Sequence, residues 1–164
     1  MRPRQRQAVR QRFGFRCGYC GVHEHQVGAE LTVDHFQPRS CGGTDEPANL
    51  IYCCPACNSH KGDYWQPGTA QRILHPLRDN MAQHVEALDD GTLHGLTTTG
   101  TFHITRLRLN RPALVALRRR QRRLEAARAA QQELLARIGE VEAQVVALRN
   151  DIEALRPESP SDAD

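Results

Sequence analysis

The distribution of apolar and polar positions along this chain predicts two kinds of element. Two short runs rich in β-branched and aromatic residues, 30–35 and 49–53, predict strands. Residues 111–156 predict one long helix, and apolar side chains at 138, 141, 145, 148, 152 and 155 recur there at an alternating three- and four-residue spacing. The pattern therefore predicts an α+β fold, with a small mixed core before a long C-terminal helix.

Shorter elements surround the two predicted strands. Residues 3–13 are expected to form a short basic helix, because Pro3 suits a first helical turn and Gly14 suits a helix end. Residues 38–47 contain Gly and Pro turn signals and predict a loop. Residues 55–64 predict a helix, so the expected order is strand, loop, strand, helix.

The middle of the chain carries weaker signals. Residues 66–82 are expected to be irregular. Residues 83–109 are expected to form short antiparallel strands, with turns at 89–91 and 99–100. Asn110 is expected to cap the long helix that follows.

The second half of the long helix has a heptad pattern. Its apolar a and d positions are Leu134, Ile138, Val141, Val145, Leu148, Ile152 and Leu155. Ile or Val at a, with Leu frequent at d, favours a parallel two-stranded coiled coil. We expect a homodimer through residues 131–155; the alternatives are packing on the protein's own domain or on another protein.

The net charge of +3 conceals two strongly basic segments. Residues 1–16 carry six arginines and no acid, and residues 106–128 carry nine arginines against one acid, Glu125. Such clusters predict contact with a polyanion, most simply nucleic acid. The alternative is a solvated basic face without a partner.

The composition suits a small domain, with 39% hydrophobic residues and only 5% aromatic ones. A core of this size needs an additional staple such as zinc. The N-terminus lacks the apolar segment of a signal peptide, and no apolar run reaches transmembrane length. We therefore expect a cytoplasmic protein without a membrane partner, in which paired cysteines stay reduced and bind metal.

Two Cys-x-x-Cys pairs, Cys17 with Cys20 and Cys54 with Cys57, predict one tetrahedral zinc site. Two intervening residues let both sulfurs of a pair turn toward one ion. Four thiolates leave no open coordination position, so the zinc is expected to be structural. The alternative is that these cysteines are buried without a metal.

Other residues compete for the same role. Cys53 adjoins Cys54 but lacks the two-residue spacing to Cys57. His23 or His25 could replace a thiolate, although an exposed position in a loop is the simpler expectation.

Residues between and after the two Cys pairs suit hydrolysis of a phosphodiester. That reaction needs a base for water, a cation to offset charge on the phosphate and stabilisation of the leaving oxygen. His35 would supply the base near neutral pH. Asp34 precedes it on the same strand, so the strand end must bend to bring both side chains to one phosphate. The simpler alternatives are a turn cap for Asp34, a satisfied polar residue for His35 and a β-turn residue for Asn49.

The motifs of residues 12–63 occur in a specific order. They are Cys-x-x-Cys, Leu-Thr-Val-Asp-His-Phe-x-Pro-Arg-Ser, Gly-Gly-Thr-Asp, Asn-Leu and Cys-x-x-Cys-Asn-x-x-Lys. This series resembles the HNH endonucleases, which belong to the ββα-metal nucleases. The resemblance implies a zinc-stapled ββα-metal core that cleaves DNA with a divalent cation.

The resemblance also implies roles for individual residues. His35 would be the general base, and Asn49 would orient its imidazole. Asp34 and Asn58 would bind the catalytic cation. Many members have His where this chain has Asn58; an amide oxygen is a harder ligand, which favours Mg²⁺ or Mn²⁺. The expected nucleic-acid-binding residues are Lys61, Arg39, Arg12, Arg16, Arg118, Arg119 and Arg122.

Four segments are expected along the chain. They are a nuclease core with its basic helix (1–66), a β-rich extension (67–110), the long helix or coiled coil (111–156) and a disordered acidic tail (157–164). The predicted activity is metal-dependent hydrolysis of DNA by an endonuclease. The alternatives are a zinc-dependent nucleic-acid-binding module and a coiled-coil adaptor, neither of them catalytic.

Overall fold

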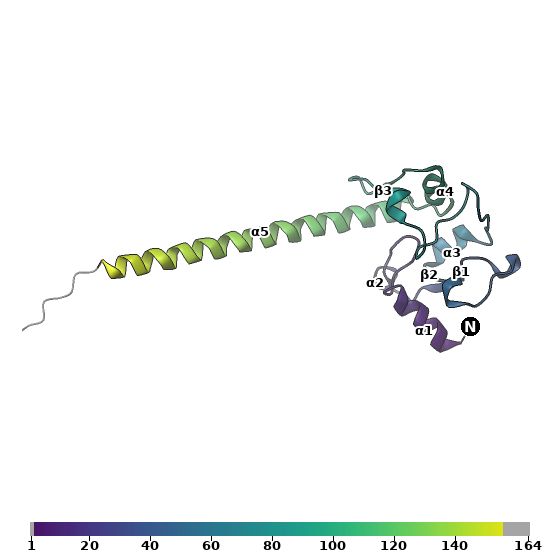
Figure 1. Ribbon diagram of the computed structural model, residues 1–164, viewed down its shortest axis with the longest axis horizontal. Helices are drawn as coiled ribbons and strands as arrows, with labels where there is room; N and C mark the ends of the chain where they lie inside the picture. Colours follow the sequence, from purple (N-terminus) through teal and green to yellow (C-terminus); the bar gives the residue numbers. More distant parts are fainter. Residues whose placement is uncertain (1, 156–164) are drawn as a thin grey trace, which may run out of the picture. The chain divides into compact units, whose positions relative to one another are not determined.

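The computed structural model of the chain describes residues 2–155. It has two compact units, Met1–Arg119 and Arg120–Asp164. The first unit holds both the predicted nuclease core and the predicted extension. Figure 1 shows the helices and strands of this unit gathered together. The predicted tail, 157–164, lies outside the described residues.

A β-hairpin followed by a helix forms the centre of the first unit. β1 (Thr32–His35) pairs antiparallel with β2 (Leu50–Cys53), and His35 stands opposite Leu50. α3 (Pro55–Lys61) begins directly after β2 and contacts β1. The predicted order of strand, loop, strand and helix is confirmed; both strands and the helix are shorter than predicted, and the loop is longer.

The segment between the strands is a loop that contains two short 3-10 turns, η1 (Arg39–Cys41) and η2 (Pro47–Asn49). The loop folds back on itself at Gly43. A Cβ atom at this position would lie 1.8 Å from the backbone oxygen of Gln37. Glycine is therefore required for the tight approach that turns the chain from β1 toward β2.

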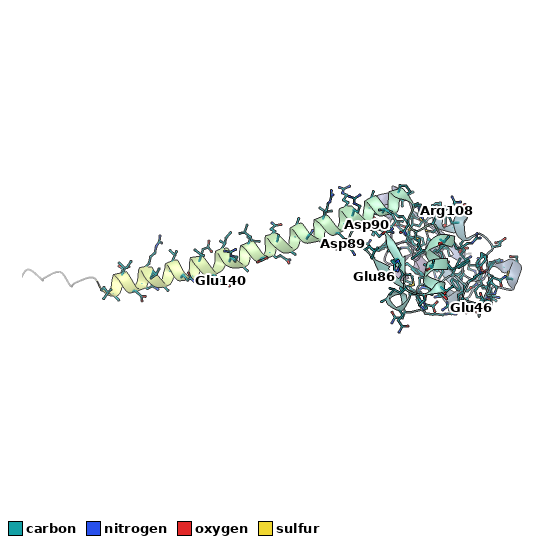
Figure 2. The ribbon with its side chains drawn as sticks, turned by 90° about the horizontal axis from the view of Figure 1, so that it is seen from above. Glu46, Glu86, Asp89, Asp90, Arg108 and Glu140 are labelled. Atoms are coloured by element: carbon teal, nitrogen blue, oxygen red, sulfur yellow. The ribbon has the colours of Figure 1, made fainter. Side chains whose placement is uncertain are left out.

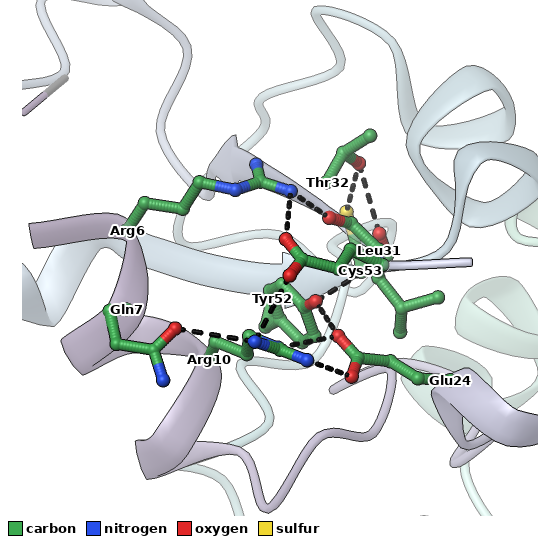
Figure 3. Close-up of polar contacts among 9 residues, drawn as sticks. Arg6, Gln7, Arg10, Glu24, Leu31, Thr32, Tyr52 and Cys53 are labelled. Carbon is green, nitrogen blue, oxygen red and sulfur yellow. Dashed lines mark hydrogen bonds and ion pairs between the residues drawn. The ribbon is translucent and has the colours of Figure 1, made fainter. Parts of the chain in front are cut away.

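α1 (Pro3–Arg12) packs against both strands, and a polar network joins it to α2 (Glu24–Val27) and β2 (Figure 3). Arg10 donates to both carboxylate oxygens of Glu24, at 2.8 and 2.7 Å, and the Tyr52 hydroxyl donates to the same carboxylate. These contacts, chiefly the one from Arg10, lower the pKa of Glu24 to about 2. The predicted basic helix is confirmed, but part of its charge faces the protein.

The extension contains one hairpin and one helix. β3 (Val85–Ala87) pairs antiparallel with β4 (Leu93–Gly95), and the predicted turn at 89–91 lies between them. The further strands predicted up to residue 109 are wrong, because α4 (Thr98–Arg106) occupies that stretch.

Two local contacts explain this helix. The Thr97 side chain accepts a hydrogen bond from the Gly100 backbone at 3.0 Å and thereby caps α4. Gly100 also lies against His84, whose backbone oxygen would be 1.8 Å from a Cβ atom. The glycine marks a close contact within a helix rather than the predicted turn.

The β1–β2 hairpin and the extension (67–110) share one hydrophobic core. Its most deeply buried side chains include Leu31, Leu50, Ile51, Tyr52, Leu107 and Leu109. The extension therefore packs directly on the elements that carry the candidate site.

α5 (Pro112–Ala154) confirms the predicted long helix. Asn110 does not cap it, because its side chain bonds the backbone of Leu93 at 2.7 and 2.8 Å. Along the helix in the second unit, side chains project outward (Figure 2), and Ile138 and Leu148 are 45% and 61% exposed. Coiled-coil pairing stays a prediction. None of the described helices is both long enough and apolar enough to cross a membrane.

Candidate metal centre and catalytic site

Four cysteine sulfurs converge between the turn after α1 and the start of α3. The sulfurs of Cys17, Cys20, Cys54 and Cys57 all lie within 4.8 Å of one another, and those of Cys20 and Cys54 are 3.7 Å apart. A zinc–sulfur bond of about 2.3 Å implies a tetrahedron with edges of about 3.8 Å. The four side chains therefore fit one zinc ion, and the predicted cluster is confirmed.

The thiols of this cluster interact strongly with one another. Hydrogen bonds with Cys17, Cys20 and Cys54 raise the pKa of Cys57. Arg111 supplies positive charge at the same place: its Nη2 lies 3.6 Å from the Cys57 sulfur and 3.7 Å from the Cys54 sulfur. A bound zinc with four thiolates carries net negative charge, which this guanidinium would partly offset.

The competing residues lie elsewhere. Cys53 is fully buried in β2, and burial raises the pKa of its thiol. His23 caps α2 by accepting a hydrogen bond from the His25 backbone, and the two rings stack at 4.7 Å. Neither histidine belongs to the sulfur cluster, so the four cysteines are the better candidate set of zinc ligands.

His35 ends β1 beside a carboxylate that comes from the loop. Its Nε2 lies 2.6 Å from the Asp45 carboxylate, and Arg39 bonds both oxygens of that carboxylate at 2.5 Å. The hydrogen bonds from His35 and Arg39 lower the pKa of Asp45, so it is ionised near neutral pH. An anion at Nε2 fixes the ring and stabilises an imidazolium, as a general base requires.

Asp34 points toward α3. Its carboxylate lies 2.9 Å from the ammonium group of Lys61, and 14% of its side chain is exposed. Lys61 is 1% exposed and also donates to the backbone oxygens of His35 and Gly62, at 2.7 and 3.2 Å. This enclosed position does not fit the predicted contact of Lys61 with phosphate; the lysine instead ties β1 to α3.

Burial raises the pKa of Asp34, while the charge of Lys61 opposes that shift. Asn58 lies one helical turn before Lys61 and shares its face of α3, which contacts β1. The candidate site thus has a carboxylate on β1 and an amide on α3, two elements in contact. Mg²⁺ typically takes one or two carboxylates and completes its shell with substrate phosphate and water, so this donor set fits a hard cation.

Asn49 bonds the backbone of the loop and, in the part of the chain that the structure describes, makes no hydrogen bond with the His35 imidazole. Among the described contacts, its side chain accepts from the Gln37 backbone at 2.8 Å and donates to the backbone oxygens of Gln37 and Thr44, at 3.1 and 2.9 Å. These bonds hold the two sides of the loop together. The predicted action on the imidazole is therefore indirect, through the loop that carries Asp45.

The candidate DNA contacts fall into two groups. Arg12 donates to the backbone oxygens of Pro47 and Leu50, and Arg118 donates to those of Gly91 and Leu109, at 2.6 and 2.7 Å. These two arginines brace the first unit. In the second group, Arg16 donates to the backbone oxygen of Gly21 at 3.3 Å and Arg39 bonds the Asp45 carboxylate. The other two candidates are Arg119 and Arg122.

Residues 17–64 match the HNH endonuclease family model. This HNH segment spans the two Cys pairs, both strands, the loop and α3, and the match confirms the resemblance drawn from the motifs. Comparisons with curated proteins and with solved structures gave no match. HNH nucleases act on DNA and use divalent metals, so the HNH segment is of nuclease type.

Two residues of the site were missed in the sequence. Asp45 belongs to the Gly-Gly-Thr-Asp motif, and its position between a glycine turn and Asn49 was a signal that could have marked it. Arg111 carried no such signal, because it lies 54 residues from Cys57 and reaches the sulfurs only through the fold.

Proposed function

We propose that the protein is an endonuclease that hydrolyses DNA phosphodiester bonds with Mg²⁺ or Mn²⁺. The observation that carries this proposal is the pair of His35 and ionised Asp45 at the end of the strand that also bears Asp34. A general base, its orienting anion and a cation-binding carboxylate thus come from one short stretch of backbone.

His35 would act through the ring nitrogen opposite Asp45. If Nε2 carries the proton donated to Asp45, Nδ1 is the basic nitrogen that takes a proton from water. Asp34 and Asn58 would hold the cation, which supplies charge stabilisation for the phosphate and the leaving oxygen. The ion pair with Lys61 would hold the Asp34 carboxylate in position.

The four-cysteine site would hold structural zinc. Its role is to fix the start of α3, and with it Asn58, against the hairpin. Thiolate ligands require reduced cysteines, which supports a reducing compartment such as the cytoplasm. Contacts from Arg16, Arg39, Arg119 and Arg122 to phosphates would give binding that weakens with salt.

The test is cleavage of supercoiled plasmid by the full chain with MgCl₂, with and without EDTA. His35→Ala should lower the rate about 10²- to 10⁴-fold, the range of general-base catalysis. His25→Ala, which removes an exposed imidazole in α2, should cut like the wild type. Equal cutting by His35→Ala, or cutting that survives EDTA, would contradict the proposal.

A second function, DNA binding without hydrolysis, has one observation in its favour. The Lys61 ammonium already neutralises Asp34 and would compete with a cation for that carboxylate. Under this alternative the plasmid would be bound but not cut at any Mg²⁺ concentration.

We also propose that the apolar stripe of α5 forms a two-stranded coiled coil. Its support is the exposure of heptad residues that would otherwise meet water, including Ile138 and Val145. Two catalytic segments on one dimer could reach both strands of a duplex.

A further inference from the structure

A hollow of about 300 Å³ lies beside the catalytic strand, within the first unit. Its lining includes Phe36, Trp65, Arg72, His75, Arg78 and Asp79. Phe36 directly follows His35, so the hollow begins one residue from the proposed base. Its volume is at the lower end of the ~300–1,000 Å³ typical of small-molecule sites.

The walls of the hollow are aromatic. The rings of Phe36 and Trp65 meet edge to face at 5.6 Å, and those of Phe36 and His75 meet at 4.5 Å. Phe36 and Trp65 are only half-buried, so their rings reach the surface of the hollow. Flat aromatic walls of this kind suit a flat aromatic guest.

The charge of the hollow favours an anionic strand. Asp79 is the one acid among the lining residues, and Arg72 neutralises it through two bonds of 2.6 and 2.8 Å. Asp79 also accepts from the His75 backbone at 2.7 Å, which fixes the wall. Arg78 adds an exposed positive charge at the rim, and Gln66 offers an amide that can pair with a polar ring edge.

A second hollow of about 220 Å³ adjoins this pocket and is lined by residues of the loop between β1 and β2. It shares Phe36, Trp65 and Arg78 with the first and is also lined by Thr44 and Asn49. Trp65 therefore stands between the pocket and the loop that carries Asp45. Phe36, the residue after His35, lines both hollows and is the link between the pocket and a phosphate held at His35.

We propose that this pocket receives one unstacked base of the DNA strand, next to the phosphate that is cut. The proposal rests on the proposed function and narrows its substrate to DNA with an unpaired or easily unpaired base. In a regular duplex both faces of each base are covered by stacking, so the pocket is reached only at a bulge, mismatch, flap or single strand.

The test uses the fluorescence of Trp65, because the chain has one tryptophan. His35→Ala protein would be titrated with a 20-base-pair duplex and with the same duplex carrying one bulged adenine. The bulged duplex should quench Trp65 and bind roughly 5- to 150-fold more tightly, the usual effect of one stacked base. An abasic residue in place of the bulged adenine should abolish both effects.

Variants locate the effect. Trp65→Ala, followed by the anisotropy of labelled duplexes because it lacks tryptophan, should bring the affinity ratio of bulged to regular duplex close to one. Trp65→Phe should restore part of the preference, because a flat ring returns. Leu77→Ala is the matched control: Leu77 lies in the same segment, is 50% exposed and is not among the lining residues.

The outcomes of these measurements separate the pocket proposal from the nuclease proposal. Equal quenching and equal affinity for bulged, abasic and regular duplexes would contradict the proposal that the pocket binds a base. This comparison needs no substitution in the pocket, so it does not depend on whether such a variant folds. If wild-type protein fails to cut plasmid but Trp65 still responds to the bulge, the nuclease proposal fails and the pocket stands. If plasmid is cut and Trp65 does not respond, the reverse holds.

Discussion

At the residue scale, the candidate site depends on a carboxylate that the loop brings to the end of β1. Asp45 is ten residues from His35 in sequence but lies 2.6 Å from its Nε2. Gly43 and Asn49 make this possible, because one permits the tight fold of the loop and the other ties its two sides together. The histidine is therefore oriented by the loop as a whole.

Replacing Asp45 with Asn should remove the anion and keep the shape of the side chain. We expect the plasmid-cutting rate to fall about 10- to 100-fold, the effect of losing a hydrogen bond to a charged group. Because the pKa of Asp45 is lowered, the wild-type protein carries the anion throughout an assay at neutral pH. Zinc content should not change, and Asp63→Asn, an exposed carboxylate after α3, should cut normally. A full rate for Asp45→Asn would refute the role.

The pKa of Glu24 predicts how stability depends on pH. The folded pKa, about 2, lies below the ordinary value of 4.5, so the unfolded chain binds the proton more readily. The contribution of Glu24 is thus present above about pH 4.5 and is lost as the pH falls toward 2. Melting temperatures of wild type and Glu24→Gln should differ at pH 6 and converge toward pH 3.

Glu30→Gln gives a matched control for this measurement. Glu30 also bonds Arg10, at 3.1 Å, but its side chain is 53% exposed, so the pair is screened by solvent. Its melting temperature should stay close to that of wild type at every pH. A gap for Glu24→Gln that does not narrow on acidification would contradict the assigned pKa.

At the scale of elements, local signals predicted most of the HNH segment, and long-range contacts explain the failures. The Cys pairs, the strand patterns and Pro55 were readable because each depends on neighbours in sequence. α4 was not, since Gly100 serves contact with His84 rather than a turn. The enclosure of Lys61 was equally unreadable, because it depends on how α3 lies against β1.

The segment before α5 is expected to stabilise bound zinc through Arg111. Arg111→Ala should weaken zinc affinity roughly 10- to 100-fold, as for other groups that support metal ligands from outside. The measurement is zinc release to a colorimetric chelator. Arg111→Lys should fall between wild type and Arg111→Ala, and Arg119→Ala should release zinc like the wild type. Equal release by Arg111→Ala and wild type would show that the guanidinium has no effect on the metal.

At the scale of the whole molecule, the two units differ in how far their apolar side chains are buried. The first unit encloses apolar side chains in a core shared by the β1–β2 hairpin and the extension. The second leaves apolar residues of α5 exposed, and Val141 and Leu148 are 57% and 61% exposed. An isolated helix of this length gains most of its stability from packing against a partner.

We therefore predict a dimer in solution. Light scattering of the full chain should give twice the mass of 18.5 kDa. Charges at two seam positions, Ile138→Glu with Val145→Glu, should give the single-chain mass, while Glu140→Ala, outside the seam, should not. A single-chain mass for wild-type protein at tens of micromolar would exclude self-association through this stripe.

The enclosure of Lys61 has a practical consequence for chemical labelling. Lys61 is the one lysine in the sequence, and its amine is shielded from water in the folded first unit. Reagents that acylate lysine would leave this side chain unmodified until the HNH segment opens. The lysine therefore serves as an inherent reporter of whether that segment is intact.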